Sequence, residues 1–273
     1  MSATAAGAPR PAFAGAGRLA TQVGLLARRS LLRTLRQPVA LIPSLVFPLF
    51  VLAVNASGLK SATNLPGFPT RSYLTFALAL PFIQSALFAV ISAGTDLVSD
   101  LETGFLNRLQ LTPVRRAALL FGELTGVVVL GQVAALFYLA IGLIFGAHIA
   151  AGVGGLFVLL ALAALMFVGF GSLGMFVALR SASGEAVQAL FPLFFVSVFL
   201  SSVYLPRNLI HSHWFRTVAN LNPVSYLLEG IRSVLITGWD ATALARAFLI
   251  AGALAVLALT ASALALRSRM GRT

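Results

Sequence analysis

Few side chains of this sequence could take part in chemistry, because only 10% of its 273 residues are charged and none is cysteine. The lack of cysteine excludes disulfides and thiolate chemistry. His211 and His213 lie beside Trp214, but two ligands with no Asp, Glu or Cys nearby do not make a metal site. Serines are abundant, yet neither a Gly-x-Ser-x-Gly motif nor a matching His/Asp set is present. We therefore expect no catalytic residues and no metal ion in this chain.

Nucleotide chemistry is equally disfavoured. A P-loop needs Gly-x-x-x-x-Gly-Lys-[Ser/Thr], whose backbone amides hold the phosphates. The single lysine, Lys60, lies in Gly58-Leu-Lys-Ser61 and lacks those glycines. We expect this chain to hold no cofactor and to bind no ATP in that way.

The first charged cluster is the stretch 100–116, the longest polar interruption in the first two thirds of the chain. Gly104 permits a sharp bend there. One or two turns of helix with an apolar face should follow before Thr112-Pro113. So short a helix is marginal in water and needs a membrane interface or a protein groove. Both alternatives stay open from the residues alone. The charged residues in or beside this stretch are Asp96, Asp100, Glu102, Arg108, Arg115 and Arg116, and the apolar ones within it are Phe105, Leu106, Leu109 and Leu111.

The second charged cluster lies on a predicted short helix over 222–238. Asn222 is a good N-cap, Pro223 suits the first helical position, and Gly238 suits the end. Glu229 and Arg232 lie three residues apart on one face, where they could pair or merely keep the helix soluble at an interface. The helix is too apolar for a solvated loop and, at about 15 residues, too short to cross a bilayer.

The elements that hold these clusters belong to a membrane protein. The chain is 59% hydrophobic and has a mean hydropathy of +0.97, which excludes a soluble domain. The apolar runs are too long and continuous for a lipid-facing β-barrel. We predict an all-α fold with six spans of about 20 residues each. The predicted spans are 39–57, 72–95, 117–146, 154–179, 186–204 and 243–266.

Prolines and glycines give two of these spans a particular character. Pro43 and Pro48 should kink the first span, which is tolerable where neighbouring helices satisfy the freed carbonyls. Gly169, Gly171 and Gly174 in the fourth span have spacings that allow close helix contact.

The N-terminal region divides into a tail and a basic helix. Residues 1–17 are rich in Ala, Gly and Pro and are predicted to be a disordered tail. Residues 18–37 place Arg18, Gln22, Arg29, Arg33 and Arg36 in a narrow arc, with an apolar stripe beside it, and predict an amphipathic helix at the membrane surface. Arg29 and Arg33 lie in this arc. The helix could be a plain positive-inside anchor or could also contact a cytosolic partner.

The charge distribution orients the chain. The formal net charge is +12, and thirteen of the nineteen basic residues fall on the side that holds both termini. The positive-inside rule then places both termini and the loop 97–116 in the cytoplasm, and 205–240 outside. Within the spans, Gln84, Gln132 and Gln188 should face the bundle interior and are candidates for a transport pathway. We expect that pathway, lined by some of the 21 phenylalanines, to suit a hydrophobic or amphiphilic substrate.

Two motifs resemble a known family. Glu102-x-Gly104, a short apolar helix and Leu-Thr-Pro-Val-Arg115 look like the coupling region of ABC type-2 exporter permeases, the group that includes the daunorubicin-resistance permeases. Asn222-Pro-Val-Ser-Tyr-Leu-Leu-Glu-Gly-Ile-Arg232 followed by Gly238 is similar to the C-terminal signature of that family. The order, the spacing and the chain length agree as well, so the resemblance covers nearly the whole chain.

The resemblance implies a specific assembly. In that family a basic helix before span 1 and the coupling region dock on a separate ATPase subunit, which carries ATP and Mg²⁺, and two half-helices lie on the outer face. The implied protein is an exporter of a drug, lipid or glycolipid in a bacterial cytoplasmic membrane, with two ATPase copies, a second or sister permease, membrane lipids around it and no nucleic acid. The implied coupling residues are Glu102, Gly104, Phe105, Leu106, Leu109, Arg115, Arg29 and Arg33. The implied re-entrant-helix residues are Asn222, Pro223, Tyr226, Glu229 and Arg232.

The alternative is a self-contained membrane protein, either an ion-coupled secondary transporter or a membrane-embedded enzyme. It would need buried charges that form a relay, or a catalytic set. The sequence offers too few intramembrane charges for the first and no catalytic set for the second.

Overall fold

A computed structural model describes residues 13–36, 38–105, 108 and 116–270, and the regular structure in these ranges is helical throughout. Four segments are long and apolar enough to cross a membrane: Tyr73–Glu102, Ala117–Ile144, Gly152–Ser181 and Ala241–Arg269. They correspond to the second, third, fourth and sixth predicted spans and extend beyond most of the predicted bounds. The prediction of an all-α, multi-pass membrane protein is therefore confirmed.

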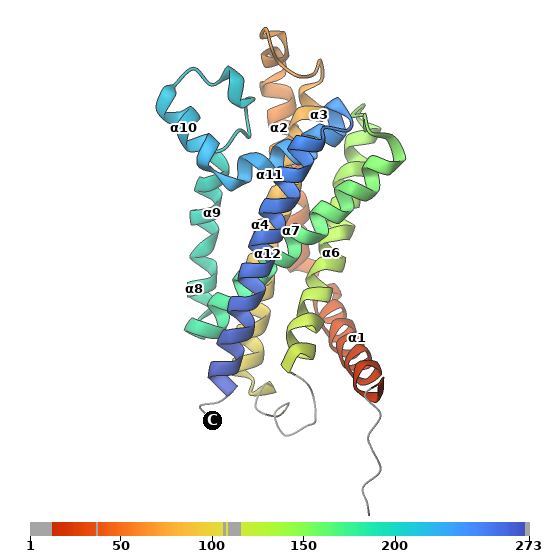
Figure 1. Ribbon diagram of the computed structural model, residues 1–273, viewed down its shortest axis with the longest axis vertical. Helices are drawn as coiled ribbons and strands as arrows, with labels where there is room; N and C mark the ends of the chain where they lie inside the picture. The colour runs from red at the N-terminus through yellow and green to blue at the C-terminus, as the bar shows by residue number, and fades with distance from the viewer. Residues whose placement is uncertain (1–12, 37, 106–107, 109–115, 271–273) are drawn as a thin grey trace, which may run out of the picture.

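The bundle is built around α4 (Ala79–Glu102), the continuation of the short α3 (Tyr73–Ala77). This segment is the most buried of the four spans. It packs against α2 (Pro38–Gly58), α6 (Arg116–Ile144) and α7 (Gly152–Ser181), and α12 (Ala241–Met270) packs on α7. Figure 1 shows α4, α7 and α12 running along the long axis of the molecule.

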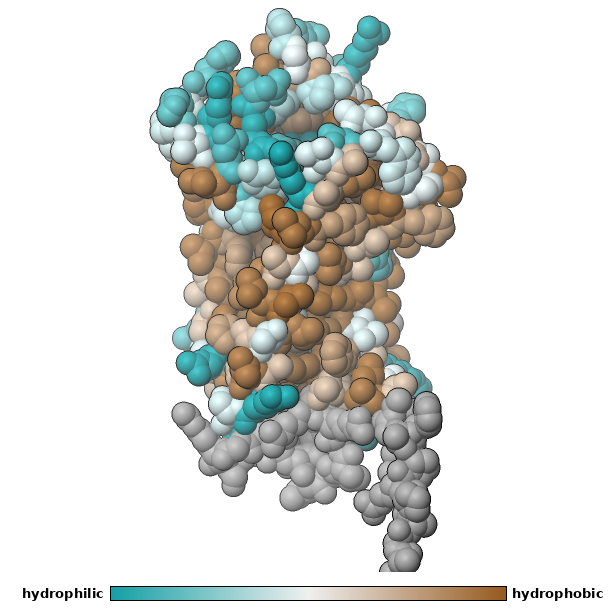
Figure 2. All heavy atoms as spheres, in the orientation of Figure 1, coloured by the Kyte–Doolittle hydropathy of each residue, from teal (hydrophilic) through white to brown (hydrophobic). Residues whose placement is uncertain are grey.

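The surface is divided as a membrane protein requires. Figure 2 shows hydrophobic side chains across the middle of the visible face, with hydrophilic ones gathered at the upper end, over α10 and α11. Among the large apolar side chains exposed at mid-height are Phe50, Val133 and Leu257. Lipid accepts such side chains without the cost that water would impose.

The contact between α4 and α7 depends on glycine, as the spacing in the fourth span predicted. A Cβ atom at Gly174 would lie 2.0 Å from the carbonyl oxygen of Val90, and one at Gly94 would lie 3.0 Å from the carbonyl oxygen of Gly174. Backbone cannot move aside as a flexible side chain can. The two helices therefore approach this closely only because position 174 lacks a side chain.

Gly174→Ala is expected to lower the free energy of unfolding by about 2–3 kcal/mol, because α7 must move away from α4 and neighbouring packing is lost. Gly252→Ala on α12 is the matched control, since the nearest atom to its added Cβ would be 3.8 Å away. Thermal unfolding of both variants in detergent measures the difference. Equal melting temperatures for the two would contradict the close contact.

Pro43 and Pro48 lie inside α2, which continues through both. Pro48 has no N–H to donate to the carbonyl of Ser44. The hydroxyl of Tyr138 on α6 donates to that carbonyl over 2.6 Å, and Tyr138 is fully buried. This confirms for Pro48 the expectation that a neighbouring helix satisfies the freed group.

The fifth predicted span, 186–204, is shorter than expected and interrupted. It consists of α8 (Gly184–Gln188) and α9 (Leu190–Phe199). Pro192 accounts for the break, because it cannot donate to the carbonyl of Gln188. The apolar run Gly184–Phe199 and the helix Ile42–Gly58 are both shorter than the four long spans.

The N-terminal helix α1 (Phe13–Leu35) begins earlier than the predicted residue 18. Residues 13–17, predicted as part of a disordered tail, thus belong to this helix, and the rest of that tail lies outside the described residues. In Figure 1, α1 lies obliquely at the end of the bundle where α12 also ends.

The mixed segment 205–240 folds into short helices at the opposite end (Figure 1). They are η2 (Arg207–Leu209), α10 (His213–Leu221), α11 (Pro223–Arg232) and η3 (Ser233–Thr237), of which η3 is a π-helical turn. On the same side, η1 (Lys60–Asn64) follows α2. Gly238 ends η3 with φ +93°, a backbone conformation that glycine adopts freely.

Candidate functional site

An ionic cluster joins α1 to the end of α4. Arg29 and Arg33 lie one helical turn apart on α1, and Asp96 and Asp100 lie one turn apart on α4. The matched spacing lets the two pairs meet along one contact line. The cluster comprises Arg29, Arg33, Asp96, Asp100 and, from α6, Glu123.

Asp100 is the centre of the ionic cluster. Its two carboxylate oxygens accept Arg29 Nη1 at 2.8 Å and Arg29 Nη2 at 2.6 Å, a bidentate pair. Arg33 Nη1 donates to the same carboxylate over 3.1 Å, and Arg33 Nε lies 3.3 Å from an oxygen of Asp96. The Asp100 side chain is 3% exposed, so solvent screens these contacts little.

Glu123 extends the cluster to α6. Its carboxylate lies 3.9 Å from Arg29 Nη1 and accepts a hydrogen bond from the hydroxyl of Ser30. Glu123 therefore pairs with α1; the side chains of Arg115 and Arg116 lie outside the described residues. The hydrogen bonds to Asp100 raise the pKa of Arg29 above its ordinary value, so this residue remains a cation.

Small residues bring α1 and α6 together beside the cluster. A Cβ at Gly122 would lie 2.4 Å from Leu26, and one at Gly126 would lie 2.4 Å from Ser30 Oγ. These glycines are four residues apart, the spacing of a close helix contact. Helix α1 is thus fixed to two spans, by charge to α4 and by packing to α6.

The other predicted coupling residues fall in the segment after α4. Residues 97–102, predicted as loop, form the last turns of α4 instead, where Asp100 pairs with Arg29 and Arg33 on α1. Glu102 is exposed, and Gly104 has φ +66°, which confirms the predicted bend. Phe105 lies with its ring centroid 3.7 Å from the guanidinium carbon of Arg29. Leu106, Leu109 and Arg115 lie outside the described residues.

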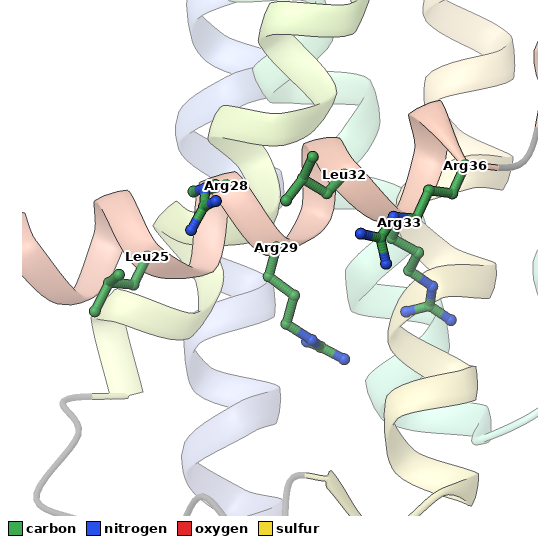
Figure 3. A pocket seen from close by; sticks show the side chains of 6 residues that line it. All are labelled: Leu25, Arg28, Arg29, Leu32, Arg33 and Arg36. Carbon is green, nitrogen blue, oxygen red and sulfur yellow. The ribbon is translucent and has the colours of Figure 1, made fainter.

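The side of α1 next to these contacts is not covered by the described residues. A hollow of about 660 Å³ runs along it and also takes in Arg29 and Arg33; Figure 3 shows the four arginines and two leucines that line it. Arg28 and Arg36 are exposed, and among the described residues, which include all seven carboxylates of the chain, none lies within 4.0 Å of either guanidinium. We call this face the basic groove; it is lined by Leu25, Arg28, Arg29, Leu32, Arg33 and Arg36.

At the other end of the bundle, α11 begins as predicted. The side chain of Asn222 accepts a hydrogen bond from the backbone N–H of Val224 over 2.9 Å, and Pro223 follows it in the first turn. The Asn222 amide also donates to the carbonyl of Ser197 on α9 over 2.6 Å. This cap therefore ties the start of α11 to the broken fifth segment.

Pairing of Glu229 with Arg232 was one of two alternatives that the sequence left open, and within this chain the structure gives each residue a different partner. Arg207 donates to both carboxylate oxygens of Glu229. Its guanidinium carbon also lies 4.4 Å from the ring centroid of Tyr226, whose hydroxyl donates to the carbonyl of Asn220. Helix position alone could not reveal Arg207, which lies 22 residues earlier.

Arg232 is buried, with 6% of the residue exposed; its guanidinium carbon lies 3.5 Å from the ring centroid of Phe76, and its hydrogen bonds among the described residues go to backbone. Its guanidinium donates to the carbonyls of Phe76, Ser202 and Val203 over 3.0, 2.6 and 2.6 Å. Phe76 lies near the end of α3. Helix α3 is interrupted before α4 begins because Pro81 cannot donate to the carbonyl of Ala77. Arg232 thus joins that interruption to the chain that follows α9.

The three glutamines proposed for a pathway occupy three different environments. Gln84 is 3% exposed, and its Oε1 has no hydrogen-bond partner among the described residues. Gln132 donates to the carbonyl of Leu160 on α7 over 2.8 Å. Gln188 is exposed at the end of α8, contrary to the expectation that it faces the interior of the bundle.

Aromatic side chains do line one face, along α2, α4 and α9. Successive ring centroids lie 5.0 to 6.3 Å apart, and each ring is partly exposed on the single chain. We call this the phenylalanine row; its members are Phe47, Phe88, Phe191, Phe195 and Phe199.

Sequence reasoning missed several residues at these sites. Asp96 and Asp100 were noticed but not assigned a role, and Glu123, Gly122, Gly126 and Arg207 were not named as site residues. The signal for the ionic cluster was available in the shared four-residue spacing of Arg29 and Arg33 and of Asp96 and Asp100. No comparable signal marks Arg207.

Comparison with known proteins gives one family. The sequence pattern of the ABC-2 type transporter family matches residues 21–236. Three similar proteins are named "Putative transport permease ycf38". The one from Porphyra purpurea is 27% identical over 225 residues, covering 81% of this chain and 76% of the relative. The one from Cyanophora paradoxa is 25% identical over 210 residues, covering 76% and 72%. The one from Pyropia yezoensis is 26% identical over 217 residues, covering 78% and 74%.

Proposed function

Since the chain belongs to the ABC-2 type transporter family and is a membrane subunit of an ABC transporter, we propose that it is the permease of an ATP-driven exporter. The observation that carries the proposal is the fixation of α1. One side of this helix is bound to α4 and α6, and the adjacent side, which shares Arg29 and Arg33 with the first, is exposed, basic and partly apolar. A force applied to the exposed side would reach two spans directly.

The partner is an ABC ATPase subunit, in two copies, which holds ATP and Mg²⁺. The sequence of this chain has no P-loop motif, so hydrolysis takes place on the other polypeptide. Arg28 and Arg36, whose guanidinium groups have no carboxylate partner among the described residues, complement an acidic surface, and Leu25 and Leu32 offer apolar contact between them. The segment 104–111 docks on the same subunit.

Coupling proceeds through the ionic cluster. ATP-driven closure of two ATPase subunits moves α1, and the bidentate Arg29–Asp100 pair transmits that movement to α4. The ATPase shifts the populations of the two bundle arrangements if it binds them with unequal affinity. Glu102, Gly104 and Phe105 lie at the end of the same helix, so the docking segment and α1 act on one element.

The substrate is hydrophobic or amphiphilic, such as a drug, a lipid or a glycolipid. The phenylalanine row supports this proposal because it forms an apolar track that is partly exposed on a single chain. A second copy of the chain, or a sister permease, would cover the track and complete a pathway between the two.

The protein spans a bacterial cytoplasmic membrane with both termini in the cytoplasm. Six crossings result if α2 and the pair α8–α9 cross in addition to the four long spans. An even number of crossings agrees with the position of α1 and the end of α12 at the same end of the bundle (Figure 1). The excess of basic residues at that end fits the positive-inside rule.

Gly104→Pro and Leu106→Asp are expected to uncouple ATP hydrolysis from export. No atom of the described residues lies within 4 Å of an added Cβ at Gly104, so the substitution acts through the backbone: proline cannot adopt φ +66°. Leu106→Asp places a charge on the apolar face that docks. Both variants should retain ATPase activity in the complex while export falls at least tenfold.

The assay is efflux of whichever candidate amphiphile most stimulates the ATPase activity of the complex. Lys60→Ala, in an exposed turn at the other end of the bundle, is the control and should export normally. Normal export by Gly104→Pro and Leu106→Asp would refute the docking role of segment 104–111.

A further inference from the structure

A second cavity lies between α11, η3 and the start of α12, at the end of the bundle away from α1. Its volume is about 200 Å³, below the about 300–1,000 Å³ of sites that enclose a drug-sized molecule. It could therefore admit a polar head group but not a whole amphiphile. We call it the α11 pocket. Its lining includes Pro69, Phe76, Glu229, Arg232, Thr237 and Asp240.

Arg232 brings an uncompensated positive charge to the α11 pocket. None of the seven carboxylates, all of which belong to described residues, lies within 4.0 Å of its guanidinium. A guanidinium has five N–H donors, and three are used on the carbonyls of Phe76, Ser202 and Val203. Two donors remain without a partner among the described residues. Buried charges in proteins are ordinarily paired, so an anion is the missing component.

The two acidic residues that line the pocket differ in their availability. Glu229 is neutralised by Arg207, which donates to both of its oxygens. Asp240 caps α12 with one oxygen only: Oδ1 accepts the backbone N–H groups of Thr242 and Ala243, each over 3.0 Å. Its Oδ2 has no hydrogen-bond partner in the described part of the chain. The pocket thus offers one unpaired cation and one available carboxylate oxygen.

The backbone around the pocket is also unusual. The turn Ser233–Thr237, which directly follows Arg232, is π-helical and ends at Gly238. Single π-helical turns cost stability and occur often at functional sites. Here the wider turn lies between Arg232 and Asp240, so it determines the separation of the two charges.

We propose that the α11 pocket binds a zwitterionic head group, with its phosphate or carboxylate at Arg232 and its ammonium at Asp240. The residual charge of the pocket favours this class over the alternatives. A purely anionic group would face the carboxylate of Asp240, and a purely cationic group would face the guanidinium of Arg232. The bound group is either the head of a membrane lipid or a free zwitterion of the same chemistry. Binding requires neither the ATPase nor transport, so its test is independent of the proposed function.

Trp239 next to Asp240 provides the readout. The chain has two tryptophans, and in a Trp214→Phe background the fluorescence reports Trp239 alone. The purified full chain in detergent is titrated with dihexanoyl phosphatidylethanolamine, with dihexanoyl phosphatidylglycerol, and with free phosphoethanolamine. We expect saturable binding of the first and at least tenfold weaker binding of the anionic second. Free phosphoethanolamine identifies the source of the head group. An affinity equal to that of the zwitterionic lipid indicates a free zwitterion, and a weaker affinity indicates a lipid. Both outcomes support the proposed chemistry.

Asp240→Asn is the decisive variant, because asparagine caps a helix as well as aspartate does and the fold should be unaffected. We expect its affinity for the zwitterionic lipid to fall about tenfold and its preference over the anionic lipid to vanish. Lys60→Ala serves as the matched control and should bind as the parent does. Equal binding of both lipids by the parent protein, unchanged affinity in Asp240→Asn, or no saturable binding by the folded chain would each overturn the proposal.

Discussion

Replacing Asp100 by asparagine lowers the free energy of unfolding by about 2–3 kcal/mol and loosens α1 from α4. Loss of one partner from a buried ion pair typically costs about 3–5 kcal/mol, and the partial exposure of Arg29 reduces that cost. Asparagine has a single acceptor oxygen, so it cannot accept all the hydrogen bonds that Arg29 and Arg33 donate to the two oxygens of the carboxylate. Thermal unfolding measures the first effect. Limited proteolysis within α1 measures the second, and cleavage should become several-fold faster.

Glu102→Gln is the matched control for this change. Glu102 lies on the same helix two residues later, is exposed, and forms no ion pair among the described residues. It should unfold and resist protease as the parent chain does. If Asp100→Asn behaves like Glu102→Gln, the ionic cluster does not hold α1, and the route proposed for coupling is lost.

Replacing Arg232 by methionine is expected to cost about 3 kcal/mol or more. The carbonyls of Phe76, Ser202 and Val203 would lose their donor together, and each unsatisfied buried group costs about 1–3 kcal/mol. Removal of an uncompensated buried charge offsets part of that sum. Methionine fills a similar volume, so a cavity contributes little. The melting temperature in detergent should fall markedly.

Two further variants show whether the loss of stability in Arg232→Met comes from the hydrogen bonds of the guanidinium. Arg232→Lys should lose less than Arg232→Met but remain below the parent, because an ammonium lacks the planar fork that reaches three carbonyls at once. Arg246→Met, an exposed arginine at the start of α12, is the control and should be nearly neutral. Parent-like stability of Arg232→Met would show that its carbonyl partners are satisfied without it.

Local features of this fold could be predicted because their causes are local. Asn222 caps the helix that it precedes, and the bend at Gly104 and the end of η3 at Gly238 follow from the freedom of glycine. The close contact at Gly174 was visible in glycine spacing. The tolerance of Pro48 inside α2 was also predictable, because a carbonyl that proline leaves free within a membrane needs another donor. The sequence could not identify Tyr138 as that donor.

The features that were missed depend on partners far away in the chain. Arg29 is 71 residues from Asp100, and Arg232 is 156 residues from Phe76, so neither contact follows from helical periodicity. The polar residues after 96 suggested a loop, whereas Asp100, paired with Arg29 and Arg33 on α1, belongs to the last turns of α4. Hydropathy likewise suggested a continuous fifth span, because it does not register what Pro192 does to the backbone.

Isolation of the complex tests the central claim, that a separate ATPase drives this chain. The tagged full chain is extracted from its own membrane, purified, and assayed for ATP hydrolysis, and the co-purifying polypeptides are sequenced. The account predicts a partner that carries Gly-x-x-x-x-Gly-Lys-[Ser/Thr] in equal amount, with ATPase activity that disappears when that partner is stripped away. It also predicts that an Arg28→Glu, Arg36→Glu variant, folded like the parent, loses this partner. A folded chain that purifies without any such protein, and whose transport persists under a proton gradient after ATP depletion, would contradict it.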